Sequence, residues 1–176
     1  MDAIDQARVE RFSSIFEQSY GRVYAYAARR VGTAHADDIA AETLLIAWRR
    51  GDVLPAEPLP WLYGIARNVV ARHHDATARG QAIRRSLELE RPSDSAEPAE
   101  DAALAAAWAT LAPRDREVLA LIAWEELSVR DAARALRCSA PVFSVRLHRA
   151  RKRLERALDQ APLRHPAPVP DLSEAS

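Results

Sequence analysis

Basic side chains gather in one stretch of the sequence, at a spacing that suits the binding of phosphates. Between residues 130 and 156 there are nine basic and two acidic residues, a local charge of +7 in a chain of zero net charge. Apolar residues recur there at three- and four-residue steps, which predicts one buried helix face: Phe143, Leu147, Ala150, Leu154 and Leu158. Arginines on the remaining faces would form a surface typical of nucleic-acid binding.

Two serines mark where helices begin in this basic stretch. Ser128 precedes a short helical pattern over residues 129–136, and Ser139 precedes a longer one whose first turn tolerates Pro141. A three-residue turn separates the two. The pattern predicts a helix-turn-helix whose second helix, residues 141–158, enters the major groove. An ordinary helical hairpin with solvated arginines is the alternative, but the capping serines, short turn and one-sided charge favour DNA binding.

The rest of the chain has helical periodicity as well, so we expect an all-α fold. Apolar stripes predict helices over about residues 12–27, 36–49 and 60–78, and no run of alternating β-branched residues interrupts them. Gly32 ends the first helix. Glycine and three prolines within residues 51–60 force a loop between the second and the third.

Composition divides the chain into two small helical domains. Residues 86–101 carry six acids and one arginine, a local charge of −5, with two prolines and three serines. Such a segment is typical of a weakly structured connection. We therefore predict a domain over 1–80, a flexible acidic linker over 81–102, a domain over 103–158 and a disordered proline-rich tail over 159–176.

Several classes of protein are excluded by what the sequence lacks. The single cysteine, Cys138, excludes an internal disulfide framework and a zinc site with several thiolates. The five glycines are too scattered for a dinucleotide or P-loop cradle. The apolar runs are too short to span a membrane, and the first residues do not read as a secretory signal. We expect a soluble cytoplasmic protein without membrane insertion, catalytic residues, metal or cofactor.

The C-terminal half contains a pattern known from one protein family. It consists of Leu111-Ala-Pro-Arg-Asp-Arg-Glu-Val-Leu119, then Glu125-Glu-Leu-Ser128, Ala132-Ala133, Leu136 and Ser139, and finally Arg146-Leu-His-Arg-Ala-Arg151. These residues resemble region 4 of bacterial RNA polymerase sigma factors, above all the extracytoplasmic-function (ECF) group, which keeps only regions 2 and 4. The resemblance implies contacts to the −35 promoter element by Ser139, Ser144, Arg146, His148 and Arg149.

Three positions depart from the family pattern. Arg137 occupies a turn position that the family usually gives to glycine, and Val142 and Ser144 stand where threonine and lysine are usual. The last two changes suggest a shifted preference for DNA sequence.

The N-terminal half resembles sigma region 2. His35-Ala-Asp-Asp-Ile-Ala-Ala-Glu-Thr43, followed by Ala47-Trp48, is similar to the helix that binds the polymerase clamp. The resemblance implies that Asp37, Asp38 and Glu42 bind core polymerase. Acids in a first helical turn would also suit the helix dipole, which accounts for Asp37 and Asp38 but leaves Glu42 unexplained.

A second stretch, Trp61-Leu-Tyr-Gly-Ile-Ala-Arg-Asn68 with residues 69–79, resembles regions 2.3 and 2.4, which melt and read the −10 element. Extruded bases need a pocket and a positive surface for the backbone. The loop over 51–60 would supply the pocket wall. The strand path would be lined by Arg67, Asn68, Arg72, His73 and Arg79. Trp61 is the first residue of the apolar stripe of its helix. This position favours a buried core residue over a platform on which DNA bases stack.

Taken together, the resemblance implies an alternative sigma factor that directs core RNA polymerase to promoter DNA, with an anti-sigma factor as a further partner. A stand-alone helix-turn-helix regulator is the main alternative, but it leaves the first domain without a role. An HD-type phosphohydrolase is a third reading. Its metal ligands would be His35, His74, Asp75 and Asp101. However, the adjacent pair His74-Asp75 lies in an arginine-flanked helix that would repel a metal ion.

Overall fold

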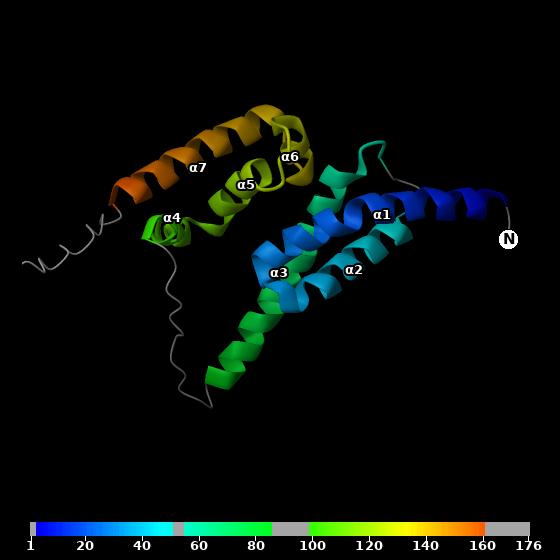
Figure 1. The fold of residues 1–176 in the computed structure, drawn as a ribbon, viewed down its shortest axis with the longest axis horizontal. Coiled ribbons are helices and arrows are strands. Elements are labelled where there is room, and N and C mark those ends of the chain that lie inside the picture. Colours follow the sequence, from blue (N-terminus) through cyan, green and yellow to red (C-terminus); the bar gives the residue numbers. More distant parts are fainter. Residues whose placement is uncertain (1–2, 51–54, 86–98, 161–176) are drawn as a thin grey trace, which may run out of the picture. The chain divides into compact units, whose positions relative to one another are not determined.

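The computed structural model of the chain describes residues 3–50, 55–85 and 99–160. These ranges contain helices and short turns and no strand (Figure 1), which confirms the predicted all-α fold. The helices are α1 (Ala3–Val31), α2 (Thr33–Arg49), α3 (Pro58–Arg85), α4 (Ala99–Thr110), α5 (Pro113–Ala123), α6 (Val129–Ala135) and α7 (Ala140–Gln160). The tail beyond residue 160, predicted to be disordered, lies outside the described residues.

The turn between α1 and α2 is a single glycine. Gly32 has a φ of +80°, in the left-handed region that favours glycine, and α2 begins at the next residue, Thr33. The predicted start near residue 36 is therefore three residues late. Asp37 and Asp38 consequently lie beyond the first turn of α2, which contains no acid, so the helix-dipole interpretation of these two residues is wrong.

Helix α3 is longer than the sequence pattern predicts. It begins at Pro58, with Pro60 also in its first turn, where the missing N–H of proline costs no helical hydrogen bond. It ends at Arg85 rather than near residue 78. Because α4 begins at Ala99, both ends of the segment predicted as a linker are helical, and Asp101 lies within α4.

Contacts group the chain into two compact units, the first formed by residues 1–91 with 120–144 and the second by 92–119 with 145–176. In the first unit α1, α2 and α3 pack on one another, and α6 packs on α3. Its largest fully buried side chains include Tyr26, Leu44 and Tyr63. This grouping describes packing in the present conformation, and the domain boundaries at 1–80, 81–102, 103–158 and 159–176 stay a prediction.

The second unit contains α4, the first part of α5 and most of α7. One guanidinium nitrogen of Arg153 donates to both carboxylate oxygens of Asp115, at 2.8 and 2.7 Å, and so ties α7 to the start of α5. The predicted apolar stripe of α7 is buried at Leu147 and Ala150 and half-buried at Leu154. Leu158 is 38% exposed, so its predicted burial near the end of the helix is wrong.

Candidate nucleic-acid interface

The helix-turn-helix forms as predicted, with a serine before each helix. The hydroxyl of Ser128 accepts a hydrogen bond from the backbone N–H of Asp131 at 3.1 Å, which caps α6. Helix α7 begins directly after Ser139, whose carbonyl oxygen accepts from the N–H of Phe143 at 3.0 Å. Local hydrogen bonds therefore fix where both helices start.

The turn between α6 and α7 has the conformation that glycine prefers, although an arginine occupies it. Arg137 has a φ of +51°. A side chain in this left-handed region costs about 1–2 kcal/mol. The N–H of the next residue, Cys138, still donates to the carbonyl oxygen of Ala133 at 2.9 Å. The departure at Arg137 thus leaves the backbone course of the turn intact.

All five residues expected at the −35 element are exposed on α7 or directly before it. Phe143, Leu147 and Ala150 are buried along one side of the helix. At about 100° per residue, His148 and Arg149 lie about 50° to either side of the opposite, outward direction. Arg146 and Ser144 lie nearer the edges of this outward face. The structure therefore brings His148 and Arg149 together on the surface that faces away from the core.

Two apolar side chains on this surface were missed by the sequence reasoning as possible DNA contacts. Val145 is 50% exposed and Val142 is 43% exposed, and Val145 lies close to the centre of the outward face. The valine at residue 142, where the family usually has threonine, is the sequence feature from which these contacts could have been predicted. The hydroxyl of Ser144 donates to the carbonyl oxygen of Ala140 at 3.0 Å, so this side chain bonds to its own helix.

The three acids expected to bind polymerase are all exposed on α2. Asp38 and Glu42 lie one turn apart on the same side of the helix. Asp37 accepts a hydrogen bond from the hydroxyl of Tyr20 at 2.6 Å, and this bond raises the pKa of Tyr20 above its ordinary value. Glu42 forms an ion pair with Arg72 of α3 at 2.6 Å. Glu42, which is expected to bind polymerase, thus contacts Arg72, which is expected to bind DNA.

Four of the five residues expected along the −10 strand are exposed on α3, and the fifth is half-buried. Asn68, Arg72 and Arg79 lie within about 40° of one another on the helix, and Arg67 lies about 100° away from Asn68. His73 lies on the other side of α3, where its ring centre is 4.6 Å from that of His35 on α2. The structure therefore brings three of the five together and places His73 apart from them.

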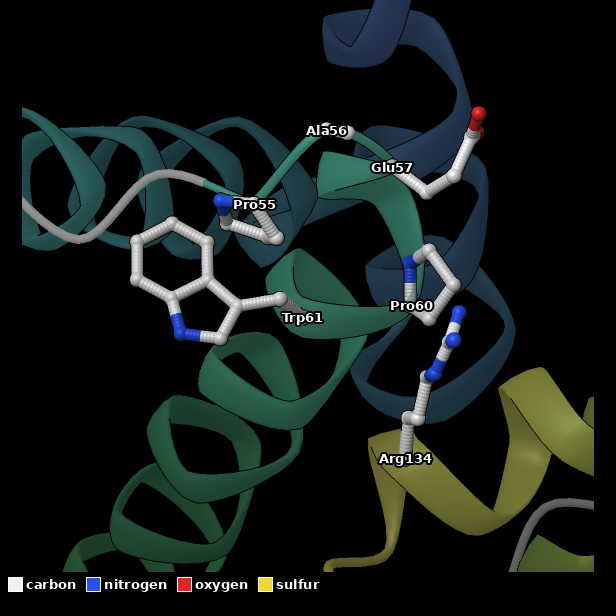
Figure 2. A pocket seen from close by; sticks show the side chains of 6 residues that line it. All are labelled: Pro55, Ala56, Glu57, Pro60, Trp61 and Arg134. Carbon is white, nitrogen blue, oxygen red and sulfur yellow. The ribbon is translucent and has the colours of Figure 1, made fainter.

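A cavity of about 400 Å³ lies where the loop enters α3, and Figure 2 shows the side chains that line it. It is lined by Pro55, Ala56, Glu57, Pro60, Trp61 and Arg134. Four residues of the predicted pocket wall thus line a cavity, Pro55, Ala56, Glu57 and Pro60, and 51–54 lie outside the described residues. Trp61 is half-buried and faces this cavity from the first turn of α3, so its interpretation as a core residue is wrong.

Two further observations concern the rival classes. Among the described side chains, no group of three or more His, Cys, Asp or Glu residues is placed to hold a metal ion. The side chain of Asp101, one of the ligands of the phosphohydrolase reading, is outside that set. No described helix is both long and apolar enough to cross a membrane.

Comparison with known proteins identifies the family of the chain. Two family models match, "Sigma-70 region 2" over residues 15–80 and "Sigma-70, region 4" over residues 101–154. The ECF RNA polymerase sigma factor BldN of Streptomyces coelicolor is 31% identical over 173 residues, which cover 90% of this chain. The chain spans 65% of the length of that relative.

Solved structures show the same fold. The sigma factor RpoE of Bartonella quintana, solved with the anti-sigma factor NepR, has a TM-score of 0.61 at 24% identity, covering 86% of this chain and 98% of that one. CnrH, solved with the cytosolic domain of CnrY, has a TM-score of 0.60 at 25% identity, covering 88% and 94%. Both sigma regions are matched in order, and the ECF relative BldN matches 90% of this chain. The chain therefore belongs to the ECF group of the sigma-70 family.

Proposed function

We propose that this chain is an alternative sigma factor that directs core RNA polymerase to specific promoters and starts transcription there. The observation that carries the proposal is the pair of family matches, over residues 15–80 and 101–154. Each match includes a helix with exposed arginines, α3 in the first and α7 in the second. Such a factor needs no catalytic residue, because the polymerase performs the chemistry. Its place of action is the cytoplasm, where polymerase and promoter DNA meet.

Helix α7 reads the −35 element in the major groove. Arg149, on the outward face, suits the bidentate contact to guanine that arginine makes most often. His148 lies on the other side of the same face and offers a second contact. Arg146 lies nearer the edge, where a phosphate contact that sets the register is expected. Ser139 and Ser144 stand at the start of α7 and along its other edge.

Helix α3 and the cavity at its start capture the melted −10 strand. The cavity beside Trp61 offers a place for an extruded base. Asn68, Arg72 and Arg79 continue from there along one side of α3, with Arg67 beside them, and supply the positive surface that a single strand requires. His73, which faces α2, is the one predicted strand contact that the geometry favours least.

The acidic side of α2 binds core polymerase. Like charges one helical turn apart repel each other by a few tenths of a kcal/mol, about 0.2–0.5 kcal/mol. A basic partner surface would offset the repulsion between Asp38 and Glu42. We also propose an anti-sigma factor as a partner, as in the solved complex of the relative RpoE. Neither a stand-alone regulator nor a phosphohydrolase is favoured by matches to both sigma regions.

The test is a pull-down with core RNA polymerase followed by run-off transcription on a pooled library of promoter fragments. We expect the chain to bind the core enzyme and to produce discrete transcripts that need both proteins. Arg149→Ala should lose these transcripts, whereas Arg151→Ala, which removes another exposed arginine of α7, should keep them. A stand-alone regulator would instead bind duplex DNA without producing any polymerase-dependent transcript.

A further inference from the structure

The turn between α6 and α7 holds an arginine in a conformation that glycine adopts most easily. Arg137 has a φ of +51°, and its backbone N–H donates to the carbonyl oxygen of Arg134 at 3.1 Å. At such a φ the β-carbon of any other residue crowds the backbone, which carries a conformational cost. Residues other than glycine that persist in such conformations often serve a function. Glycine would form the same turn at less cost, so the backbone gives no reason for an arginine here.

A second turn of the same chain provides a comparison. Glu126, after the end of α5, has a φ of +53°, and it shares a positive φ with Arg137 alone among the described residues other than glycine. The N–H of Leu127 donates to the carbonyl oxygen of Leu121 at 3.0 Å, so this turn also closes the end of a helix. Both side chains are exposed. The two turns share a backbone conformation, and they differ in charge and in the helix that follows, α6 in one case and α7 in the other.

The first part of α7, which would enter the major groove, contains no cation. Residues 139–145 have no basic side chain, and the first arginine of the helix is Arg146. The hydroxyl of Ser144 donates its one proton to the carbonyl oxygen of Ala140, so it has none for a phosphate oxygen. In a helix-turn-helix this end of the second helix contacts base edges, and contacts to nearby phosphates set the register. A charged donor for this end has to come from outside the helix.

Arg137 is the one cation placed to supply it. It is the only basic residue between Arg134 and Arg146, and it lies two residues before Ser139. Its side chain is exposed and forms no hydrogen bond or ion pair within the described part of the chain. Arg134 instead donates to Asp131 at 3.0 Å, and this pair offsets part of its charge. The N–H groups of the Arg137 guanidinium are therefore available to an anion.

We propose that Arg137 binds a phosphate of promoter DNA at the edge of the major groove where α7 begins, and that the strained turn is retained because it presents this side chain. The proposal rests on the proposed function, which supplies the promoter DNA. The planar fork of a guanidinium suits two oxygens of one phosphate. Because a phosphate contact carries no sequence information, Arg137 positions α7, and the bases are read by residues further along the helix.

The proposal sets stability against DNA binding at one residue. Arg137→Gly should raise the melting temperature of the full chain by about 2–4 °C, because glycine removes the crowding at the β-carbon. Arg137→Ala and Arg137→Lys keep a β-carbon, so their melting temperatures should stay close to that of the original chain. Differential scanning calorimetry measures these shifts. No gain for Arg137→Gly would overturn the inference that the turn is strained for the sake of its side chain.

DNA binding should change in a different order among the same variants. The probe is a DNA duplex enriched from a random library, by the full chain with core polymerase and, in a parallel selection, by the chain alone. Affinity for each duplex is measured by fluorescence anisotropy at several salt concentrations, with the same proteins as in its selection. Arg137→Gly and Arg137→Ala should both lower the slope of log affinity against log salt by about 0.9, which is about an eightfold weaker affinity at about 0.1 M salt. Arg137→Lys should keep the slope, because it keeps the charge.

Neutral phosphates locate the contact. Methylphosphonates, which carry no charge, replace the phosphates of the enriched duplex one at a time. At one position the replacement should weaken binding of the original chain severalfold, and Arg137→Gly should be indifferent to the same replacement. A merely structural role of Arg137 would leave the response to every replacement unchanged.

Glu126→Gly is the matched control, because it relieves the same backbone conformation at a turn that is not expected to bind DNA. Its melting temperature should rise as in Arg137→Gly, while its affinity for the duplex should change less than twofold and its salt slope should stay the same. The proposed contact is refuted if Arg137→Gly and Arg137→Ala keep both the salt slope and the phosphate sensitivity of the original chain, or if no duplex is enriched in either selection.

Run-off transcription with the unsubstituted chain separates this proposal from the proposed function. A chain without polymerase-dependent transcripts, whose variants at Arg137 still lose the phosphate contact, refutes the function and supports the contact. A chain that produces such transcripts, but whose variants at Arg137 bind DNA like the original, supports the function and refutes the contact.

Discussion

Helices α3 and α7 are both expected to bind DNA, yet their side chains are engaged to different degrees. On α3, Arg72 forms an ion pair with Glu42, and the ring of His73 lies against that of His35, so two of the five predicted contacts reach α2. On α7, the side chains of His148 and Arg149 form no hydrogen bond or ion pair within the part of the chain that the structure describes. The first surface is tied to its neighbour, and the second is not.

This difference follows from what lies behind each helix. Beneath the DNA-facing half of α7 the buried side chains are apolar, such as Phe143 and Ala150, and the one bond of α7 to a buried carboxylate that the structure describes, Arg153 to Asp115, lies nearer the end of the helix. The buried side of α3 includes Tyr63, which lies close to the charge of Glu125. Changes of charge should therefore affect α3 before α7, and mutations on α7 should change DNA reading without changing the fold.

The largest expected effect is a loss of stability at alkaline pH, which should arise in the core behind α3 and not in the core behind α7. Burial, and secondarily the charge of Glu125, raises the pKa of Tyr63 from its ordinary 10.0 to about 12. Below pH 10 this residue keeps its full contribution to stability. Between pH 10 and 12 only the unfolded chain ionises, so the free energy of unfolding should fall, by about 2–3 kcal/mol in total. Urea unfolding at a series of pH values measures this loss.

Tyr63→Phe is the control for this titration, because it removes the ionising group and keeps the ring. Its free energy of unfolding should decline less than that of the original chain between pH 9 and 11.5. Tyr24→Phe, at a half-buried position on α1, should decline as the original chain does. If Tyr63→Phe loses as much stability as the original chain over this range, the ionisation of Tyr63 does not make the core behind α3 more sensitive to pH than the core behind α7.

The next effect concerns the outward face of α7. Arg149→Ala should weaken binding to −35 duplex DNA by about 1–3 kcal/mol and relax the preference for one base pair. Arg146→Ala, nearer the edge, should weaken binding to all sequences alike and lower the slope of log affinity against log salt by about one. Fluorescence anisotropy with a set of single-base variants at several salt concentrations measures both. An unchanged affinity and salt slope in both variants would place the DNA on another face of α7.

A smaller effect should come from Val145, at the centre of the same face. An exposed aliphatic group on a recognition helix suits the methyl group of thymine. Thymines of the −35 element are replaced by uracil, one at a time. At the position that Val145 contacts, the replacement should weaken the free energy of DNA binding by about 0.8 kcal/mol, the usual contribution of one buried methylene group. Val145→Ala should remove this sensitivity to uracil. A chain indifferent to uracil at every position would show that Val145 reads no methyl group.

Local features of the chain were predictable from sequence and distant contacts were not. Ser128 caps α6 as expected, because a cap depends on residues three positions apart. Glu125 forms ion pairs with Arg30 and Arg29, which lie 95 and 96 positions away in the sequence, and helical periodicity carries no information about such pairs. For the same reason the sequence pattern placed Trp61 in the core, whereas it lines a cavity, and did not predict that the ring of His73 lies against that of His35. Both lie on α3 as predicted, but packing from α2 and α6 decides which side is covered.

The smallest expected effect tests whether α3 is coupled to α2. The Glu42–Arg72 pair is exposed on both sides, 48% and 62%, and such pairs contribute about 0.2–1 kcal/mol. Glu42→Gln should release Arg72, so the unbound chain should bind a −10 single strand slightly more tightly, while its affinity for core polymerase falls. Asp38→Asn, one turn away, should reduce polymerase affinity without changing strand binding. Equal strand affinities in the two variants would mean that α3, like α7, presents its DNA contacts independently of its neighbours.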